Sequence, residues 1–376
     1  MGIFNNLFDI DSRDNYAVTG LNKELNSLYI YNYFIKNKKN NLVITNSLYE
    51  ANDVYNRLLN YTNKVLFFPM DDFITSEVTD ISPEFVIDRL TTLNKLLGSG
   101  KYIVVTNLMG ILRYLPNTKL YKNKIIDINK DMDIDRDDFI NKLFDLGYEK
   151  KPVVSRTGEM AIRGYVIDIF PIEFDNPIRI EFWGDTIDSI KYFDLDDQIS
   201  NTSVDSVKIY PYTEFLIDGK IGDNIIRKQK YLLNYSDSVS GLWDYVSDSV
   251  IFYYDYNQII NSYSLLRENI LEYDSELDDD IKTNYMWDIE DISNKHNIYI
   301  LDIDNLIDLD VNNKKYVSHS IENYCGNFEK LKLDLIRYIK SGKTVILCVD
   351  DRNVVKRIVT YLELDDIIFT LSLIHI

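Results

Sequence analysis

The chain has little cysteine, histidine, glycine or proline for its 376 residues. Its 2 cysteines exclude a disulfide-stabilised secreted domain, and its 14 glycines and 7 prolines exclude a linker-rich or disordered chain. Cys325 and Cys348 form no Cys/His cluster with each other or with the 3 histidines. A structural zinc site is therefore excluded, and we expect no metal ligands in this chain.

Targeting signals and long apolar runs are also absent. The N-terminal stretch MGIFNNLFDIDSRD is acidic and lacks the basic and apolar segments of a secretory signal. No apolar run approaches the roughly 18 residues needed to cross a bilayer. These absences predict a soluble cytoplasmic protein that makes no membrane contact.

Positive charge is scarce as well. The chain has 41 Lys and Arg against 60 Asp and Glu, which gives a formal net charge of −19. Such a chain repels a phosphate backbone on average, so nucleic-acid binding would need a local basic patch. The densest positive run, KNKKN at residues 36–40, is predicted to be a solvated helix end.

Strand-like and helical segments alternate over the first 107 residues. The buried-strand runs are residues 41–45, 64–69 and 102–107, and the amphipathic helices are residues 24–36, 47–61 and 82–97. Ser47 and Ser82 are candidate N-caps, and Pro83 occupies a first helical position. This order predicts a parallel sheet with helices on its faces.

The pattern changes after Pro116. A short helix is predicted at residues 134–147, followed by the strand-like runs YVIDIF, PIRIEF and SIKYF, with a Gly-Asp hairpin turn between the last two. SVIFYYDY, at residues 249–256, then resumes the buried-strand pattern. We therefore predict a small antiparallel α+β domain inserted into the parallel-sheet domain.

A third unit is predicted to begin near residue 312, with helices at 327–340 and 353–362 around the strand TVILCV. These elements are too few to cover both faces of a sheet, so we expect a truncated α/β domain. The last six residues, LSLIHI, resemble translated adapter sequence and are expected to be a non-native tail. The predicted boundaries are 1–120 and 213–311 for the two halves of the first domain, 121–212 for the insertion, 312–370 for the third domain and 371–376 for the tail.

The segment AVTGLNKE aligns with the phosphate-binding loop G-x-x-x-x-G-K-[ST] and departs from it at three positions. Ala17 and Asn22 replace the two glycines, and Glu24 replaces the hydroxyl that holds magnesium, whereas Gly20 and Lys23 are kept. A carboxylate at position 24 would face the negative charge of a nucleotide. We predict a degenerate, helicase-like P-loop domain that no longer uses nucleotide.

The strand that ends at Asp255 supports this prediction. Helicase-type ATPases end this strand in Asp-Glu, but Tyr256 follows Asp255, and tyrosine is not a general base at neutral pH. A second match to the loop, SGKT, follows a helix and precedes a strand, so Ser341 and Gly342 are predicted to end that helix. We predict no catalytic residue in this chain.

The inserted domain contains the residues whose pattern indicates a function. Strand alternation in NPIRIEFWGD sends Ile178, Ile180 and Phe182 to one face and Arg179, Glu181 and Trp183 to the other. Since the apolar residues take the core, a tryptophan and an arginine are left on the outer face, which is typical of protein-interface hot spots. Arg163 can lie on the same outer face as this tryptophan and arginine, unless a bulge at Gly164 turns its side chain to the other face. The alternative is that Trp183 only covers a strand edge.

These segments resemble a known family. GEMAIRGYVIDIFP and NPIRIEFWGDTIDSIKYFD are similar to the N-terminal module of the bacterial transcription-repair coupling factors (Mfd), and FFPMDDF, SPEFVIDRLTTLNKLL and IVVTNLMGILRYLP extend the resemblance along the chain. That module resembles the excision-repair protein UvrB. The resemblance implies that the inserted domain docks the damage-recognition ATPase UvrA through two arginines and an aromatic, matched here by Arg163, Arg179 and Trp183, with Trp183 in place of the usual phenylalanine.

The resemblance also implies what this chain does not do itself. The motor domains, which use ATP and magnesium and translocate on duplex DNA, and the domain that binds RNA polymerase would lie beyond residue 376. We therefore expect a nucleotide-dead scaffold without a cofactor, not itself an enzyme, that recruits excision repair to stalled RNA polymerase. Two alternatives stay open: an active ATP-dependent helicase or NTPase module, and a UvrB-like module that binds damaged DNA.

Overall fold

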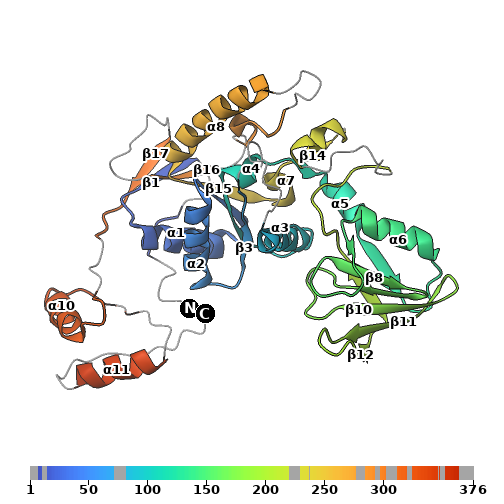
Figure 1. The fold of residues 1–376 in the computed structure, drawn as a ribbon. Coiled ribbons are helices and arrows are strands. Elements are labelled where there is room, and N and C mark those ends of the chain that lie inside the picture. Colours follow the sequence, from blue (N-terminus) through green and yellow to red (C-terminus); the bar gives the residue numbers. More distant parts are fainter. Residues whose placement is uncertain are drawn as a thin grey trace. The chain divides into compact units, whose positions relative to one another are not determined.

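The structure is a computed structural model. It describes residues 7–10, 15–71, 82–219, 229–236, 238–276, 284–292, 297–301, 311–319, 324–345, 347 and 352–363. The chain divides into two units, residues 3–317 and residues 318–376. Their elements are drawn in Figure 1. None of the described helices has the length and apolar character needed to span a membrane.

A seven-stranded parallel sheet is the centre of the first unit. Its strands are β1 (Tyr16–Thr19), β2 (Asn40–Thr45), β3 (Val65–Phe68), β4 (Ile103–Asn107), β15 (Ser249–Tyr254), β16 (Asn297–Leu301) and β17 (Asn312–Lys315). They lie in the order β17-β1-β16-β15-β2-β4-β3, and every neighbouring pair is parallel. The chain thus leaves the sheet after β4 and returns to it at β15, beside β2.

Helices cover both faces of this sheet (Figure 1). The main ones are α1 (Lys23–Asn37), α2 (Leu48–Leu59), α3 (Pro83–Leu96), α4 (Leu108–Leu112) and α8 (Tyr256–Glu276). Apolar residues of α1 and α2 pack with Val43 and Phe252, whereas those of α3 and α8 pack with Leu42 and Tyr253. Because alternate strand residues point to opposite faces, each buried strand contributes side chains to two apolar cores, one on each face of the sheet.

The helix starts follow the sequence closely. The Ser47 hydroxyl accepts a hydrogen bond from the Glu50 amide at 3.2 Å, so its predicted role as N-cap is confirmed. Pro83 is the first residue of α3, as predicted, but the Ser82 side chain makes no capping hydrogen bond. Six further short elements lie in the first unit outside the two large sheets. They are β5 (Leu115–Pro116), α5 (Thr118–Lys124), η1 (Gln229–Asn234), β14 (Val239–Ser240), α7 (Leu242–Tyr245) and α9 (Ile289–Ile292).

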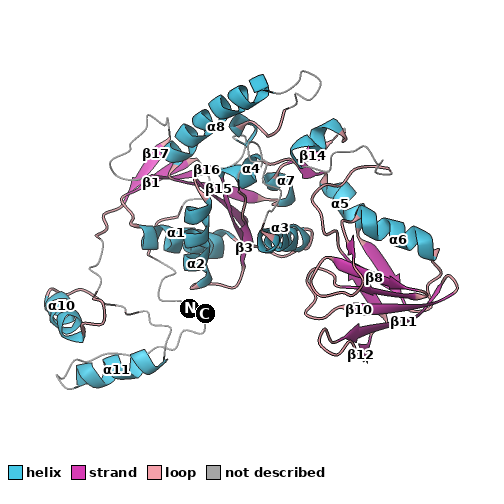
Figure 2. Ribbon diagram, viewed as in Figure 1, coloured by secondary structure: helices cyan, strands magenta, loops and turns pink. Residues whose placement is uncertain are grey.

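A six-stranded sheet forms the smaller part of the first unit. The elements of this region are β6 (Ile126–Asn129), α6 (Arg136–Asp145), β7 (Glu149–Lys150), β8 (Glu159–Arg163), β9 (Val166–Ile169), β10 (Ile178–Trp183), β11 (Thr186–Phe193), β12 (Ser200–Ser203) and β13 (Ser206–Ile209). The sheet order is β12-β11-β10-β9-β8-β7, and all pairs except β7 with β8 are antiparallel. Figure 2 shows α6 beside these strands, and the Phe139 and Phe182 rings meet between them at 6.0 Å. The expected mixed α/β class, with a large parallel sheet and a smaller antiparallel one, is confirmed.

Two hairpin turns connect the four inner strands of the six-stranded sheet. Gly184, with φ at +63°, lies between β10 and β11, so the predicted Gly-Asp turn is confirmed. Gly164, with φ at +58°, also lies in a turn, between β8 and β9, and not in a bulge. The positive φ angles explain the glycine at each position, because residues with a Cβ avoid that region.

One predicted boundary differs from the structure. The sequence places the start of the third unit at residue 312, but Asn312–Lys315 form β17 at the edge of the first unit's sheet, with the Tyr316 amide donating to the Thr19 carbonyl at 2.8 Å. An edge strand pairs on one side only, so the polar run NNKK can form it without the apolar pattern of a central strand. The other predicted domain boundaries stay predictions.

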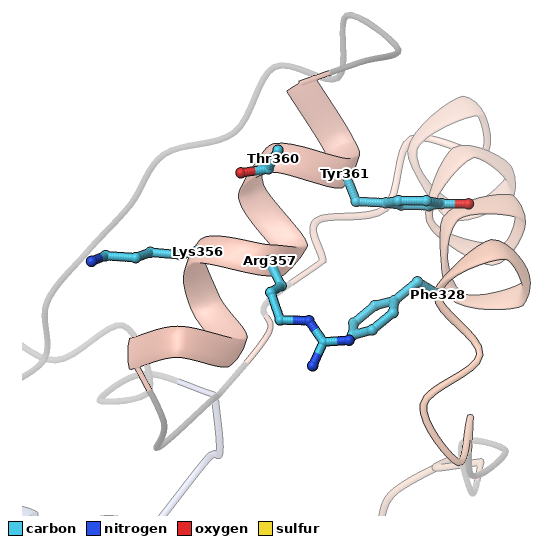
Figure 3. A pocket seen from close by; sticks show the side chains of 5 residues that line it. All are labelled: Phe328, Lys356, Arg357, Thr360 and Tyr361. Atoms are coloured by element: carbon cyan, nitrogen blue, oxygen red, sulfur yellow. The ribbon is translucent and has the colours of Figure 1, made fainter.

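The second unit contains two described helices, α10 (Phe328–Lys340) and α11 (Arg352–Glu363), close to their predicted positions. Ser341 is the C-cap of α10 and Gly342 has φ at +75°, which confirms that SGKT ends a helix. A hollow between the helices is lined by Phe328, Lys356, Arg357, Thr360 and Tyr361. Figure 3 shows Arg357 over the Phe328 ring, at 5.3 Å from its centroid. Half of the predicted strand TVILCV, residues 346, 348 and 349, lies outside the described residues, and residues 344, 345 and 347 are described but are not in a strand. The predicted tail lies wholly outside the described residues.

Candidate protein-binding face and the altered nucleotide loop

Three of the eight residues aligned with the phosphate loop, residues 17–19, lie in a strand. Ala17 and Thr19 lie within β1, where the backbone pairs with β16 on one side and β17 on the other. Only Gly20, Leu21 and Asn22 separate β1 from α1, and Gly20 makes the turn with φ at +82°. A phosphate loop needs a longer run of free backbone amides to surround the anion. The geometry of this connection offers no such run.

The start of α1 is capped by the chain itself. The Asn22 side-chain oxygen accepts from the Leu25 amide at 2.9 Å. Lys23 and Glu24 are exposed, and the Glu24 carboxylate lies 3.9 Å from the Arg57 guanidinium of α2. Arg57 also pairs with Asp53 at 3.0 Å. The Glu24 carboxylate of the altered loop is therefore directed toward α2.

Asp255 lies at the same carboxyl edge of the sheet. It follows β15 with φ at +61°, and its carboxylate accepts from the Gln258 side-chain amide at 2.6 Å. Burial raises the pKa of the nearby Glu50, and the charge of Asp255 raises it further, while Lys23 opposes the shift. Carboxylates thus outnumber cations where a nucleotide would place its phosphates. Within the described ranges, no cluster of His, Cys, Asp and Glu could hold a metal ion.

The outer face of the antiparallel sheet has the predicted alternation. Ile178, Ile180 and Phe182 are buried, and Trp183 is 82% exposed. Because Trp183 is mostly exposed, it covers little of the neighbouring strand, and its role in docking stays a prediction. The side chains of the two arginines differ: that of Arg163 is 45% exposed and that of Arg179 is 17% exposed.

A buried carboxylate holds both arginines. Asp168, on β9, lies directly opposite Arg179 of β10, and its side chain is 1% exposed. Its Oδ1 accepts from Arg179 Nε at 2.8 Å and its Oδ2 accepts from Arg179 Nη2 at 3.0 Å. Arg163 Nη2 donates to the same Oδ2. Paired, bidentate contacts of this kind compensate the cost of burying a carboxylate.

Further contacts fix Arg179 in the sheet. Its Nη1 donates to the Gln198 carbonyl at 3.2 Å and to the Ser200 hydroxyl at 3.4 Å. The guanidinium also lies over the Phe193 ring, 4.7 Å from the centroid. The hydrogen bond with Asp168, more than any other contact, raises the pKa of Arg179 above its ordinary value. Arg179 is thus part of the sheet structure as well as of its outer face.

Sequence reasoning missed Asp168 and Tyr165. Asp168 lies in the strand run YVIDIF, where alternation alone places it on the outer face beside the arginine strands, but cross-strand register is not readable from one sequence. Tyr165 follows Gly164 in the hairpin turn and is 66% exposed. Its carbonyl accepts from the Phe182 amide at 2.9 Å, which places it next to the strand that carries Trp183.

Comparison with known proteins identifies this part of the chain. Residues 126–215 match the model of the UvrB interaction domain. The chain is also similar to transcription-repair-coupling factors: that of Staphylococcus haemolyticus is 34% identical over 216 residues, 57% of this chain and 18% of the relative. That of Staphylococcus epidermidis is 31% identical over 235 residues, 62% of this chain and 20% of the relative. The chain is related to the transcription-repair-coupling factors.

The resemblance to the UvrB-like N-terminal module of these factors, stated from the sequence, is thereby confirmed. The chain spans about a fifth of the length of the curated transcription-repair-coupling factors it matches. Arg163, Arg179 and Trp183 all lie within the residues that match the UvrB interaction domain. Gly20, Lys23, Glu24 and Asp255 lie outside them.

Proposed function

We propose that this chain docks UvrA and so couples a stalled RNA polymerase to nucleotide excision repair, as part of a transcription-repair coupling factor. The docking face consists of Arg163, Tyr165, Arg179 and Trp183, on the outer face of the antiparallel sheet. The match to the UvrB interaction domain supports the partner. Binding of RNA polymerase and translocation on duplex DNA are assigned to the rest of such a factor, by resemblance.

The exposure of Trp183 carries this proposal. The indole is 82% exposed at the end of a strand whose alternate residues are buried in a core. Leaving so large an apolar group in water is unfavourable, and burying it against a partner recovers about 25 cal/mol per Å² of apolar surface. An aromatic beside an arginine is the composition of interface hot spots.

We further propose that the parallel-sheet domain is a helicase-like P-loop fold that no longer binds nucleotide. The support is the continuation of β1 through Thr19, which leaves three residues before α1. The carboxylates of Glu24, Glu50 and Asp255 near this edge also oppose an anionic ligand. The chain then acts as a scaffold and needs no cofactor of its own.

Charge reversal tests the docking proposal. Titration calorimetry should show binding of purified UvrA to the chain, and Arg163→Glu should weaken it by at least about tenfold, because a contact with an acidic group becomes a like-charge repulsion. Lys208→Glu is the matched control, since that side chain is 63% exposed on β13 of the same region. Equal losses in the two variants, or none in Arg163→Glu, would contradict the docking assignment.

Thermal denaturation tests the nucleotide proposal. A ligand that binds only the folded state at about 100 times its Kd stabilises that state by about 2.7 kcal/mol. We therefore expect that millimolar ATP with magnesium leaves the Tm of the chain unchanged. A rise in Tm that Lys23→Ala abolishes would show that the altered loop still holds phosphate and would favour the NTPase alternative.

A further inference from the structure

We propose that Asp168 is the positioning residue of the docking face, and that Arg163, not Arg179, is the cation that contacts the partner. In this arrangement Asp168 anchors Arg179 in the sheet and orients Arg163 at the surface. The partner group would be a single carboxylate that lies beside an apolar recess for Trp183. This inference rests on the proposed function for the identity of the partner.

The contacts that Arg179 makes within the sheet leave few of its hydrogen-bond donors available to a partner. Its three nitrogens donate to both Asp168 oxygens, the Gln198 carbonyl and the Ser200 hydroxyl. Its side chain is 17% exposed. A partner that pulled Arg179 outward would break both hydrogen bonds of its bidentate pair with Asp168. That carboxylate is 1% exposed, so water could not replace the lost bonds, and leaving a buried charged group under-bonded is costly. Arg179 therefore stays with Asp168 when the face is occupied.

Arg163 is placed differently. It ends β8, directly opposite Val166 of β9, and Val166 is in turn opposite Glu181 of β10. Its Nη2 donates to Asp168, and its side chain remains 45% exposed. A guanidinium that is held by one nitrogen, in a side chain that is 45% exposed, can meet a carboxylate without breaking its anchor.

The charges beside Arg163 define the partner chemistry. Glu181 accepts from Lys191 Nζ at 2.7 Å, and this contact lowers the pKa of Glu181, so that pair is neutral at physiological pH. Asp168 balances one of the two arginines. One positive charge is left over among these five side chains, and it is at the exposed end, on Arg163. The face should therefore recognise one acidic group next to an apolar surface.

Conservative and neutral substitutions at the two arginines separate these roles. Arg163→Lys keeps an exposed charge and should bind UvrA within about threefold of the unaltered chain, while Arg163→Gln should lose about tenfold. Arg179→Lys keeps the charge but not the planar fork that matches Asp168. It should lose about tenfold in affinity and lower the Tm, and Asp168→Asn should do the same.

The outcomes distinguish the inference from the proposed function. Absence of UvrA binding by the unaltered chain would overturn the proposed function. The positioning role of Asp168 is tested by the Tm instead. An unchanged Tm in both Arg179→Lys and Asp168→Asn would overturn that role. Normal binding by Arg179→Lys combined with loss in Arg179→Gln would show that the cation at position 179 meets UvrA. If the variants at 168 and 179 do not fold, Arg163→Gln still decides, because unaltered affinity in that variant would overturn the contact.

Discussion

Replacing Trp183 with alanine should weaken UvrA binding by about 2 kcal/mol, or roughly thirtyfold, with little change in Tm. The indole is 82% exposed, so its removal leaves no cavity in the core beneath Ile180 and Phe182. The loss in binding comes from the apolar area that a partner would cover. Trp183→Phe should keep most of the affinity, because an aromatic anchor remains. Titration calorimetry and thermal denaturation measure the two effects separately.

Tyr49→Ala is the matched control for this experiment. Tyr49 is 84% exposed on α2 of the parallel-sheet domain, away from the residues that match the UvrB interaction domain. It should bind UvrA as the unaltered chain does. A similar loss in both variants would mean that exposed aromatics on this chain act without specificity. Normal affinity of Trp183→Ala would remove the main support for the docking face.

The sequence predicts the facing of β10 because strand periodicity is a local property. Ile178 and Phe182 are buried, and Trp183 is exposed, as alternation requires. The same local reasoning places the helix starts at Ser47 and Pro83. Where the outcome depends on residues that are adjacent in the sequence, one sequence is enough to predict it.

Features that depend on pairing between distant segments could not be predicted. The contact of Asp168 with Arg179 depends on the register of β9 against β10, which places these two residues directly opposite each other. The sequence therefore assigned Arg179 to the partner, although its guanidinium is largely used within the sheet. β17 was missed for a related reason, since its polar residues are stabilised by one neighbouring strand and not by burial in a core.

A buried ion triad joins the end of the segment that matches the UvrB interaction domain, residues 126–215, to helices of the parallel-sheet domain. Glu214, after β13, accepts from Arg89 Nε at 2.9 Å and Nη2 at 3.1 Å, and from Arg113 Nη2 at 2.8 Å. The three side chains are 1–4% exposed. Arg89 lies in α3, and Arg113 directly follows α4. In the sequence, Glu214 is 125 residues from Arg89 and 101 residues from Arg113. No local pattern indicates such a contact.

Glu214→Gln should lower the free energy of unfolding by about 3–5 kcal/mol, because it leaves two buried guanidinium groups without a counter-charge. Urea denaturation near neutral pH measures this loss. Glu149→Gln is the matched control, since that carboxylate is 60% exposed in the same region, and it should change the stability by less than about 0.5 kcal/mol. Equal effects in the two variants would show that the triad adds nothing to stability.

The same triad makes stability depend on pH at the acidic end. Burial alone would raise the pKa of Glu214, but Arg113 and Arg89 outweigh it and hold the pKa below its ordinary value. A carboxyl whose pKa is lower in the folded than in the unfolded state stabilises the fold fully above the unfolded pKa of about 4.3. That contribution is lost as the pH falls from there through the folded pKa. The free energy of unfolding of the unaltered chain should therefore decline more steeply below about pH 4.3 than that of Glu214→Gln, whose position 214 does not titrate. Parallel acid profiles for the two chains would mean that another carboxylate controls acid unfolding, and that the contact between the two domains survives without its charge.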